Sequence, residues 1–193
     1  FITNHFENDS DCENITILSA DKDFYQLISK KTSVYSPTKK KLYGIKEVVN
    51  EYGVHPNNFL IYKTLLGDPS DNIPGITGLG PKKIIKMFPV SDETEHDLQF
   101  IMNYCKENNR AKTMYGNVLE MEKQLKINYQ LMNIRTPNIS EEDKLYILNL
   151  INEEINTLNI GNFVMLYESD GLGESINHPH SWLSDTFGSL ILK

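Results

Sequence analysis

Two pairs of aspartates are the residues of this sequence whose types and spacing could support chemistry. Asp21 and Asp23 follow an apolar run, and Asp68 and Asp71 stand three residues apart in a turn rich in glycine and proline, a spacing that puts both carboxylates on one side. Like charges this close repel each other and are tolerated when a cation lies between them. Carboxylate oxygens suit Mg²⁺ or Mn²⁺, so the pairs predict a divalent-metal site. Each pair alone is also consistent with a plainer structure, Asp23 as a helix cap and the second pair as a solvated turn.

A glycine loop followed by lysines comes after the second aspartate pair and has the layout of a helix-hairpin-helix. Glycines let the backbone turn tightly and approach a phosphate, and the helix that begins near Pro81 offers free N–H groups to that phosphate. Lysines in the first turn oppose the helix dipole, so their placement indicates that an anion binds there. A nucleotide-binding glycine loop would follow a strand and have another glycine spacing. The sequence therefore predicts contacts to the DNA backbone, independent of base sequence, from Gly75, Gly78, Gly80, Lys82, Lys83 and Lys86.

The elements that must position the first aspartate pair form a strand, helix, strand pattern. The β-branched run over 15–18 predicts a buried strand of a parallel sheet, and 32–35 predicts a second strand. Asp23 can cap a helix between them. In open α/β sheets, ligands bind beyond the carboxyl ends of the strands, which is where Asp21 and Asp23 lie. We therefore expect an α/β fold that contains part of a mostly parallel sheet, followed by a helical region.

The rest of the chain has a helical pattern. Apolar spacing and caps predict helices over 45–52, 56–66, 82–88, 98–106, 112–127 and 141–158, with an extended segment over 130–134. Ser140 is placed to cap the last of these helices. The expected division is an α/β core over 1–43, a helical region over 44–160 that holds the hairpin motif at 67–88, and a tail over 161–193. The tail has no assignment, and it could pack on the body or contact a replication protein.

The composition is that of an ordinary globular domain. With 193 residues, 39% of them hydrophobic, the chain can bury one core. No apolar run reaches the roughly 18 residues of a membrane span, and no signal peptide is visible, so we expect an intracellular, cytoplasmic protein. Cys12 and Cys105 lie far apart, which argues against a zinc site and a disulfide framework. The formal charge of −7 argues, taken alone, against a nucleic-acid partner, but lysines gather at 30–31, 39–41 and 82–86, so a DNA-binding face remains open.

Three motifs in register resemble the 5′-nuclease superfamily, which includes flap endonucleases, the 5′→3′ exonuclease domain of bacterial DNA polymerase I and phage ribonuclease H enzymes. The first motif runs from Ser19 to Phe24 and continues with Gln26 and Leu27. The second runs from Gly67 to Gly75, and the third from Gly78 to Lys82. Their order and separation also match the family. The resemblance covers residues 15–90 well, and from there to residue 160 only a compatible helical pattern remains.

The resemblance implies a PIN-like nuclease core joined to a helix-hairpin-helix (H3TH) region that hydrolyses phosphodiester bonds in a structure-specific way. It assigns the two aspartate pairs to catalysis and to two divalent ions, Mg²⁺ or Mn²⁺, which activate a water and stabilise the leaving oxygen. It also implies a monovalent cation, with K⁺ as the candidate, on backbone carbonyls near Ile76 and Leu79. The implied partners are flap, nicked or RNA-primed DNA and replication proteins. The protein is expected to act as a monomer in DNA replication or repair, in a bacterial or phage-infected cell.

The sequence departs from the family pattern at its start. The family has further ligands on an N-terminal aspartate and on an acidic helix, and these would be expected just before Phe1. We therefore expect either that the numbered sequence omits an N-terminal portion or that the fragment is inactive. Two alternatives remain: a helix-hairpin-helix module that binds DNA without catalysis, and a small-molecule phosphohydrolase, which would make no use of the glycine loop.

Overall fold

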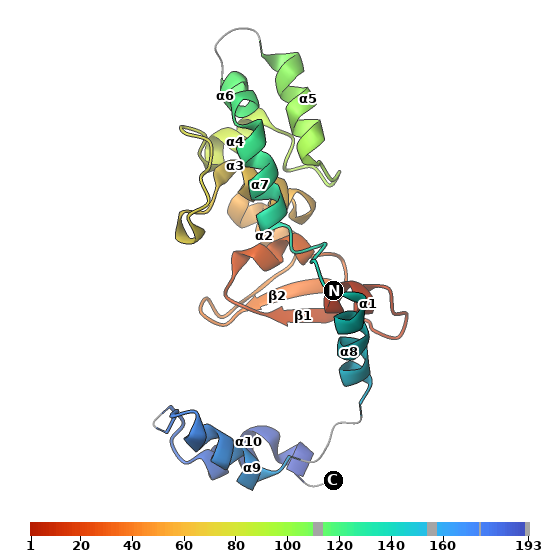
Figure 1. The fold of residues 1–193 in the computed structure, drawn as a ribbon, viewed down its shortest axis with the longest axis vertical. Coiled ribbons are helices and arrows are strands. Elements are labelled where there is room, and N and C mark those ends of the chain that lie inside the picture. Colours follow the sequence, from red (N-terminus) through yellow and green to blue (C-terminus); the bar gives the residue numbers. More distant parts are fainter. Residues whose placement is uncertain (110–113, 154–157, 174, 192–193) are drawn as a thin grey trace. The chain divides into compact units, whose positions relative to one another are not determined.

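The computed structural model describes residues 1–109, 114–153, 158–173 and 175–191, and the chain forms two compact units, Phe1–Asn138 and Ile139–Lys193 (Figure 1). The divisions expected after residues 43 and 160 remain predictions. Within the described residues, no helix has both the length and the apolar character that crossing a membrane requires.

The sheet of the first unit is small and mixed. Its strands are β1 (Ile15–Leu18), β2 (Thr32–Ser36) and β3 (Lys41–Tyr43), in that order. The first two strands are parallel, as predicted, but β2 and β3 are antiparallel, so the expectation of a mostly parallel sheet is correct for one strand pair and wrong for the other. The cause is the short turn between β2 and β3, in which Lys40 has a positive φ of 50°, because a connection this short can join only antiparallel strands.

The segment between β1 and β2 is a 3₁₀ helix, η1 (Lys22–Leu27), and its cap differs from the prediction. The side chain of Asp21 caps it by accepting a hydrogen bond of 2.8 Å from the backbone N–H of Asp23. The expected cap at Asp23 is therefore wrong by two residues. An aspartate side chain readily accepts from the N–H two residues further on, and this favours the earlier position.

Helices form the rest of the first unit. Their bounds are α1 (Ile2–Glu7), α2 (Ile45–Tyr52), η2 (Pro56–Asn58), α3 (Phe59–Leu66), η3 (Pro69–Asp71), α4 (Pro81–Met87), α5 (Leu98–Asn108), α6 (Met114–Glu120) and α7 (Glu122–Met132). The prediction of an extended segment over 130–134 is wrong for residues 130–132, which belong to α7. Leu125 and Met132 are buried on the same face of this helix, and their packing stabilises it to its last residue. The helix predicted over 112–127 is divided between α6 and α7, and its first two residues lie outside the described part.

Aromatic side chains at the centre of the core hold η1 in place. Tyr25 stacks on Tyr43 of β3 with 4.8 Å between ring centroids, and it meets Phe59 of α3 edge-on at 5.4 Å. All three rings are buried. Aromatic pairs in these orientations stabilise a core beyond the area that they bury. The turn that carries Asp21 and Asp23 is therefore fixed by contacts from two other elements.

In the second unit, the described residues form the helices α8 (Glu141–Asn152), α9 (Ile160–Ser169) and α10 (Pro179–Ile191). Ser140 caps α8 as predicted, by accepting a hydrogen bond of 3.0 Å from the N–H of Asp143. The predicted helix over 141–158 ends early, and 154–157 lie outside the described residues. The segment over 161–193, which had no assignment from the sequence, is thus largely helical in its described residues. Its helices α9 and α10 pack together around buried Leu183, and the ring centroids of Phe163 and Trp182 are 6.2 Å apart.

The lysine-rich turn between β2 and β3 is partly neutralised by one glutamate of α2. Glu51 lies 2.7 Å from Lys39 Nζ and 3.0 Å from Lys41 Nζ, and it accepts a hydrogen bond of 2.8 Å from the Tyr43 hydroxyl. Its contact with Lys39 is the main reason that the pKa of Glu51 is lowered to about 2. Two of the three lysines at 39–41 therefore stabilise the turn between β2 and β3.

Replacement of Glu51 by glutamine should make the stability of the first unit less dependent on pH. A carboxyl whose folded pKa lies below its unfolded value of 4.5 stabilises the fold above that value and loses the contribution as the pH falls toward about 2. Since the Glu51 side chain is 32% exposed, solvent screening reduces the contribution to about 1 kcal/mol. Urea unfolding followed by circular dichroism should show this deficit in Glu51→Gln at neutral pH and its disappearance at about pH 2. Glu122→Gln, in an exposed pair with Lys126, is the control and should change little. A deficit that persists in acid would show that packing, and not charge, is lost.

Candidate functional site

The first aspartate pair lies just beyond the carboxyl end of β1. The chain leaves the sheet at Ser19, whose N–H donates to the Tyr35 carbonyl at 3.0 Å. The hydroxyl of Ser19 then accepts from the N–H of Asp21 at 3.1 Å. These bonds turn the chain within three residues, so that Asp21 is exposed at the edge of the sheet and Asp23 is partly buried in η1.

The second pair lies in a tight loop that a short antiparallel bridge closes. Asp68 and Ile73 exchange two backbone hydrogen bonds of 2.9 Å each, and η3 with Asp71 lies between them. Asp68 also accepts from the backbone N–H of Ser70 at 3.0 Å and from its hydroxyl at 2.5 Å. The carboxylate of Asp68 is therefore oriented by the loop itself, whereas the Asp71 side chain is exposed.

Lys63 of α3 joins the two pairs. Its Nζ lies 2.6 Å from Asp23 Oδ1 and 2.5 Å from Asp68 Oδ2, and its side chain is only 12% exposed. The two carboxylate oxygens can thus be no farther apart than the sum of these distances. Asp23 Oδ1 is buried, and the ammonium of Lys63 is the polar group that offsets its burial. One aspartate of each predicted pair therefore meets the other at a shared positive charge.

Contacts between Lys63 and Asp68 favour the charged forms of both groups. Hydrogen bonds from Lys63 and Ser70 lower the pKa of Asp68 to about 2. Burial opposes the charge on Lys63, but its contacts with Asp23 and Asp68 outweigh that effect and raise its pKa. The result is two carboxyl groups gathered at a partly buried site, and carboxylate oxygens are the donors that Mg²⁺ or Mn²⁺ prefers.

Asp21 and Asp71 are not drawn into a closed cluster with the other two aspartates. Among the described residues, no group of three or more His, Cys, Asp or Glu side chains is placed to hold one metal ion. Assignment of all four aspartates to a metal site thus remains a prediction. An open cleft with a volume of about 400 Å³ borders Lys63 and Asp68. Its lining combines charged groups with rings, and includes Asp21, Lys22, Tyr52, Phe59, Tyr62, Gly67 and Ser70.

The glycine loop at 75–83, named the glycine hairpin, contains three glycines that differ in what their positions require. A Cβ on Gly75 would lie 1.8 Å from the Leu66 carbonyl oxygen, so this position requires the close approach of two backbones. Gly78 has a φ of +80°, which glycine adopts without strain. Gly80 precedes α4, and a Cβ there would meet no atom within 4 Å. The first two glycines build the turn, and the third leaves open space at the start of α4.

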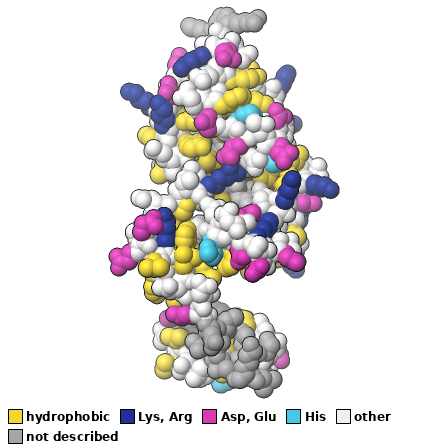
Figure 2. Space-filling view, turned by 90° about the vertical axis from the view of Figure 1, so that its right-hand side faces the viewer, with side chains coloured by type: hydrophobic (Ala, Val, Ile, Leu, Met, Phe, Trp, Pro, Cys, Tyr) yellow, Lys and Arg dark blue, Asp and Glu magenta, His cyan; other side chains and the backbone are white. Residues whose placement is uncertain are grey.

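Two backbone carbonyls of the hairpin already accept hydrogen bonds within the chain. The Ile76 carbonyl accepts the N–H of Leu79 at 3.0 Å, so one of the two predicted monovalent-cation ligands closes the turn. The Gly78 carbonyl accepts from Lys83 Nζ at 2.8 Å. Lys82 and Lys86 are exposed. On the face shown in Figure 2, Lys and Arg side chains are interspersed with acidic ones.

Sequence reasoning missed Lys63, although the sequence carries a signal for it. Every other side chain of α3 is apolar or is the threonine Thr64, and Lys63 is the one charge in this buried helix. A lysine rarely enters a buried segment without a partner. The signal therefore indicates an acidic partner, but it does not say which one.

The comparisons with known proteins agree with these motifs. No protein-family model matches the chain. It is 32% identical over 132 residues to a 5′-3′ exonuclease of Aquifex aeolicus (strain VF5), which is 67% of this chain and 43% of that protein. It is 33% identical over 108 residues to DNA polymerase I of Rhizobium leguminosarum, which is 54% of this chain and 10% of that protein. The chain thus spans less than half the length of these relatives.

Two solved structures from bacteriophage T5 share the fold. One is a protein co-crystallised with metal ions, with a TM-score of 0.54 and 23% identity, covering 62% of this chain and 44% of that chain. The other is a flap endonuclease in a pseudo-enzyme–product complex with DNA and metal ions. It has a TM-score of 0.52 and 22% identity, and the match covers 62% of this chain and 43% of that chain.

Alanine substitutions should show that the turn requires glycine at residue 75 and tolerates a side chain at residue 80. Gly75→Ala should destabilise the first unit by about 3 kcal/mol or more, because its Cβ would collide with the Leu66 backbone. Gly80→Ala meets no neighbour and should cost less than about 1 kcal/mol. Urea unfolding followed by circular dichroism measures both. Equal losses in the two variants would contradict this assignment.

Removal of the shared ammonium should leave the metal-free protein less stable. Lys63→Met leaves two partly buried carboxylates without their counter-charge, at an expected cost of about 2–4 kcal/mol. Because a divalent ion can replace the missing charge, Mg²⁺ should reduce the deficit and EDTA should restore it. Thermal unfolding with and without Mg²⁺ gives the answer. Lys126→Met breaks an exposed pair of 2.6 Å with Glu122 and is the control. A deficit that Mg²⁺ leaves unchanged would mean that Asp23 and Asp68 do not share an ion.

Proposed function

Because the chain belongs to the 5′-3′ exonuclease and flap endonuclease family and is homologous to the 5′ nuclease domain of DNA polymerase I, we propose that it is part of a structure-specific 5′ nuclease. The proposed reaction is metal-dependent hydrolysis of phosphodiester bonds in flap, nicked or RNA-primed DNA, during replication or repair. The meeting of Asp23 and Asp68 at Lys63 is the observation that supports this proposal most directly.

The proposed mechanism uses carboxylates to hold two divalent ions, Mg²⁺ or Mn²⁺. When bound, such ions activate a water for in-line attack and stabilise the leaving oxygen. Asp23 and Asp68 are close enough to share an ion, and we assign Asp21 and Asp71 to the same site as additional ligands. Lys63 holds Asp23 and Asp68 together, which offsets their mutual repulsion. The chain spans less than half the length of the two relatives described above.

We assign DNA binding to the glycine hairpin and the start of α4. Gly78 and Gly80 let a phosphate approach the backbone, and Lys82, Lys83 and Lys86 supply positive charge. The related T5 flap endonuclease was solved with DNA and metal ions, which supports this role. We retain a K⁺ site on the carbonyls near Ile76 and Leu79 as a proposal. Gly75 acts indirectly, through the shape of the turn.

A second candidate function is a non-catalytic module that binds DNA through the same hairpin. It is favoured by the lack of a three-ligand acidic group among the described residues and by the ammonium of Lys63, which already neutralises two of the aspartates. A nuclease would cleave DNA and need divalent ions to do so. A binding module would bind DNA and leave it intact.

Cleavage of a 5′-labelled flap by the full-length protein distinguishes these functions. With Mg²⁺ we expect short 5′ products that EDTA abolishes, and Asp68→Asn should lower kcat by about 100-fold or more while DNA affinity changes little. Asp97→Asn is the matched control, since Asp97 caps α5 through the N–H of Phe100 and asparagine caps equally well. Equal cleavage by Asp68→Asn would remove Asp68 from the site. DNA binding without any cleavage by the unmodified protein would favour the second candidate.

A further inference from the structure

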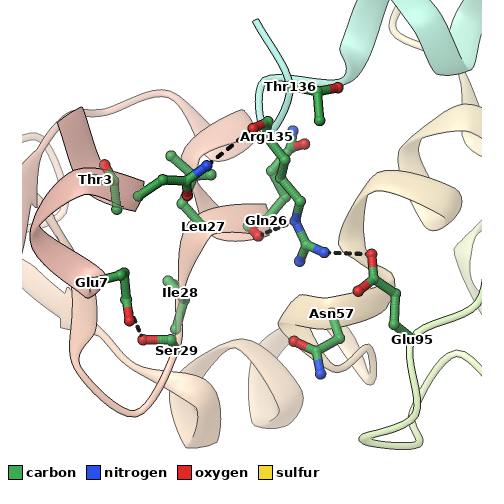
Figure 3. A pocket seen from close by; sticks show the side chains of 11 residues that line it. Thr3, Glu7, Gln26, Leu27, Ile28, Ser29, Asn57, Glu95, Arg135 and Thr136 are labelled. Atoms are coloured by element: carbon green, nitrogen blue, oxygen red, sulfur yellow. Dashed lines mark hydrogen bonds and ion pairs between the residues drawn. The ribbon is translucent and has the colours of Figure 1, made fainter. Parts of the chain in front are cut away.

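The end of α7 is bound to the turn that carries the first aspartate pair through a buried glutamine. Gln26 is 2% exposed and lies three residues after Asp23. Its Nε2 donates to the Met132 carbonyl at 3.0 Å, and its Oε1 accepts the N–H of Ile134 at 3.3 Å. Arg135 Nε donates to the Gln26 carbonyl at 2.7 Å (Figure 3). Three hydrogen bonds thus join one residue of η1 to the segment that ends α7.

Arg135 extends this contact to two further segments. Its Nη1 lies 2.7 Å from Glu95 Oε1, and its Nη2 donates to the Pro56 carbonyl at 3.2 Å. Figure 3 shows the guanidinium between Gln26 and Glu95. Because a guanidinium donates in several fixed directions, one side chain can set the relative positions of several backbones.

The middle of α7 is bound to the second aspartate loop through another buried amide. Asn128 is fully buried, and its Nδ2 donates to the Pro74 carbonyl at 2.8 Å and to the Thr64 carbonyl at 3.2 Å. Its Oδ1 accepts from Gln124 at 2.9 Å. Pro74 follows the loop that begins at Asp68, and Thr64 follows Lys63. Asn128 therefore holds both the lysine helix and the base of the aspartate loop.

We propose that Gln26, Asn128 and Arg135 form a brace through α7 that sets the spacing between the two halves of the candidate metal site and the hairpin. Asn128 and Met132 are one helical turn apart, which fixes their anchors about 6 Å from each other along the helix axis. Apolar residues could fill the same volume, but they would not fix one register. A buried amide left without partners is costly, so the brace favours the single arrangement that satisfies it. These three are positioning residues, and the proposal rests on the proposed nuclease function.

Hydrogen exchange of the full-length protein tests the brace without any need for catalysis. Gln26→Met and Asn128→Leu keep the approximate side-chain volume and remove the hydrogen bonds of these two side chains, while the bond from Arg135 to the backbone carbonyl of residue 26 stays. Asn58→Leu is the matched control, because Asn58 is equally buried but holds the loop at 92–97 through the carbonyls of Asp92 and Thr94. The brace variants should exchange about 10-fold faster at 21–27 and 67–75, and the control should do so only at 92–97. A uniform rise in all three variants would overturn the proposal.

Kinetics on the labelled flap tests whether the brace positions the reaction. A displacement of the carboxylates relative to the bound DNA should lower kcat by about 10- to 100-fold, change KM less than about twofold, and spread the cuts over neighbouring phosphodiesters. Arg135→Met, at a less buried position, gives the same readout if the other variants fail to fold. Loss of active protein with an unchanged cut position would mean that the brace serves stability alone. A lack of cleavage by the unmodified protein would reject the nuclease function and leave the exchange result standing.

Discussion

The close approach of Asp23 and Asp68 is the constraint on which the first unit depends. Two like unit charges about 5 Å apart repel by about 3 kcal/mol at an effective dielectric constant of ~20. The ammonium of Lys63 offsets this repulsion within the folded chain. The rest of the unit serves to hold the three groups together. Rings of β3 and α3 fix η1, a backbone bridge closes the aspartate loop, and α7 is bonded to both.

The hairpin repeats the same electrostatic principle on a smaller scale. Lys83 donates to the Gly78 carbonyl next to the position predicted for a monovalent cation, as Lys63 lies where a divalent cation was expected. Lys63 contacts the carboxylates that are proposed to bind a divalent ion, and Lys83 contacts a carbonyl that lies between the two proposed to bind a monovalent cation. A flexible side chain can leave such a position more easily than a backbone can rearrange.

Sequence reasoning was most successful where short-range patterns decide the structure. The β-branched runs of β1 and β2, the cap at Ser140 and the glycine hairpin depend on neighbours within a few residues, and the structure has these elements where they were predicted. The last turn of α7 was missed, since it is fixed by packing against distant segments, and the antiparallel β3 was missed although the short turn before it decides its direction. The same holds for the site. The aspartates were proposed from their spacing and stay a prediction, whereas the contact of Lys63 with Asp23 and the bond of Asn128 to Pro74 join residues far apart in sequence.

The position of the single tryptophan affects how this protein can be observed. Trp182 lies in α10 of the second unit, next to Phe163 and Phe187, whereas the aspartates, the hairpin and α7 belong to the first unit. Indole emission therefore reports on the environment of the C-terminal helices. If the two units unfold separately, an optical transition at this wavelength says nothing about the metal site. The tyrosines of the first unit, among them Tyr25, Tyr43 and Tyr62, carry the spectroscopic signal of the site itself.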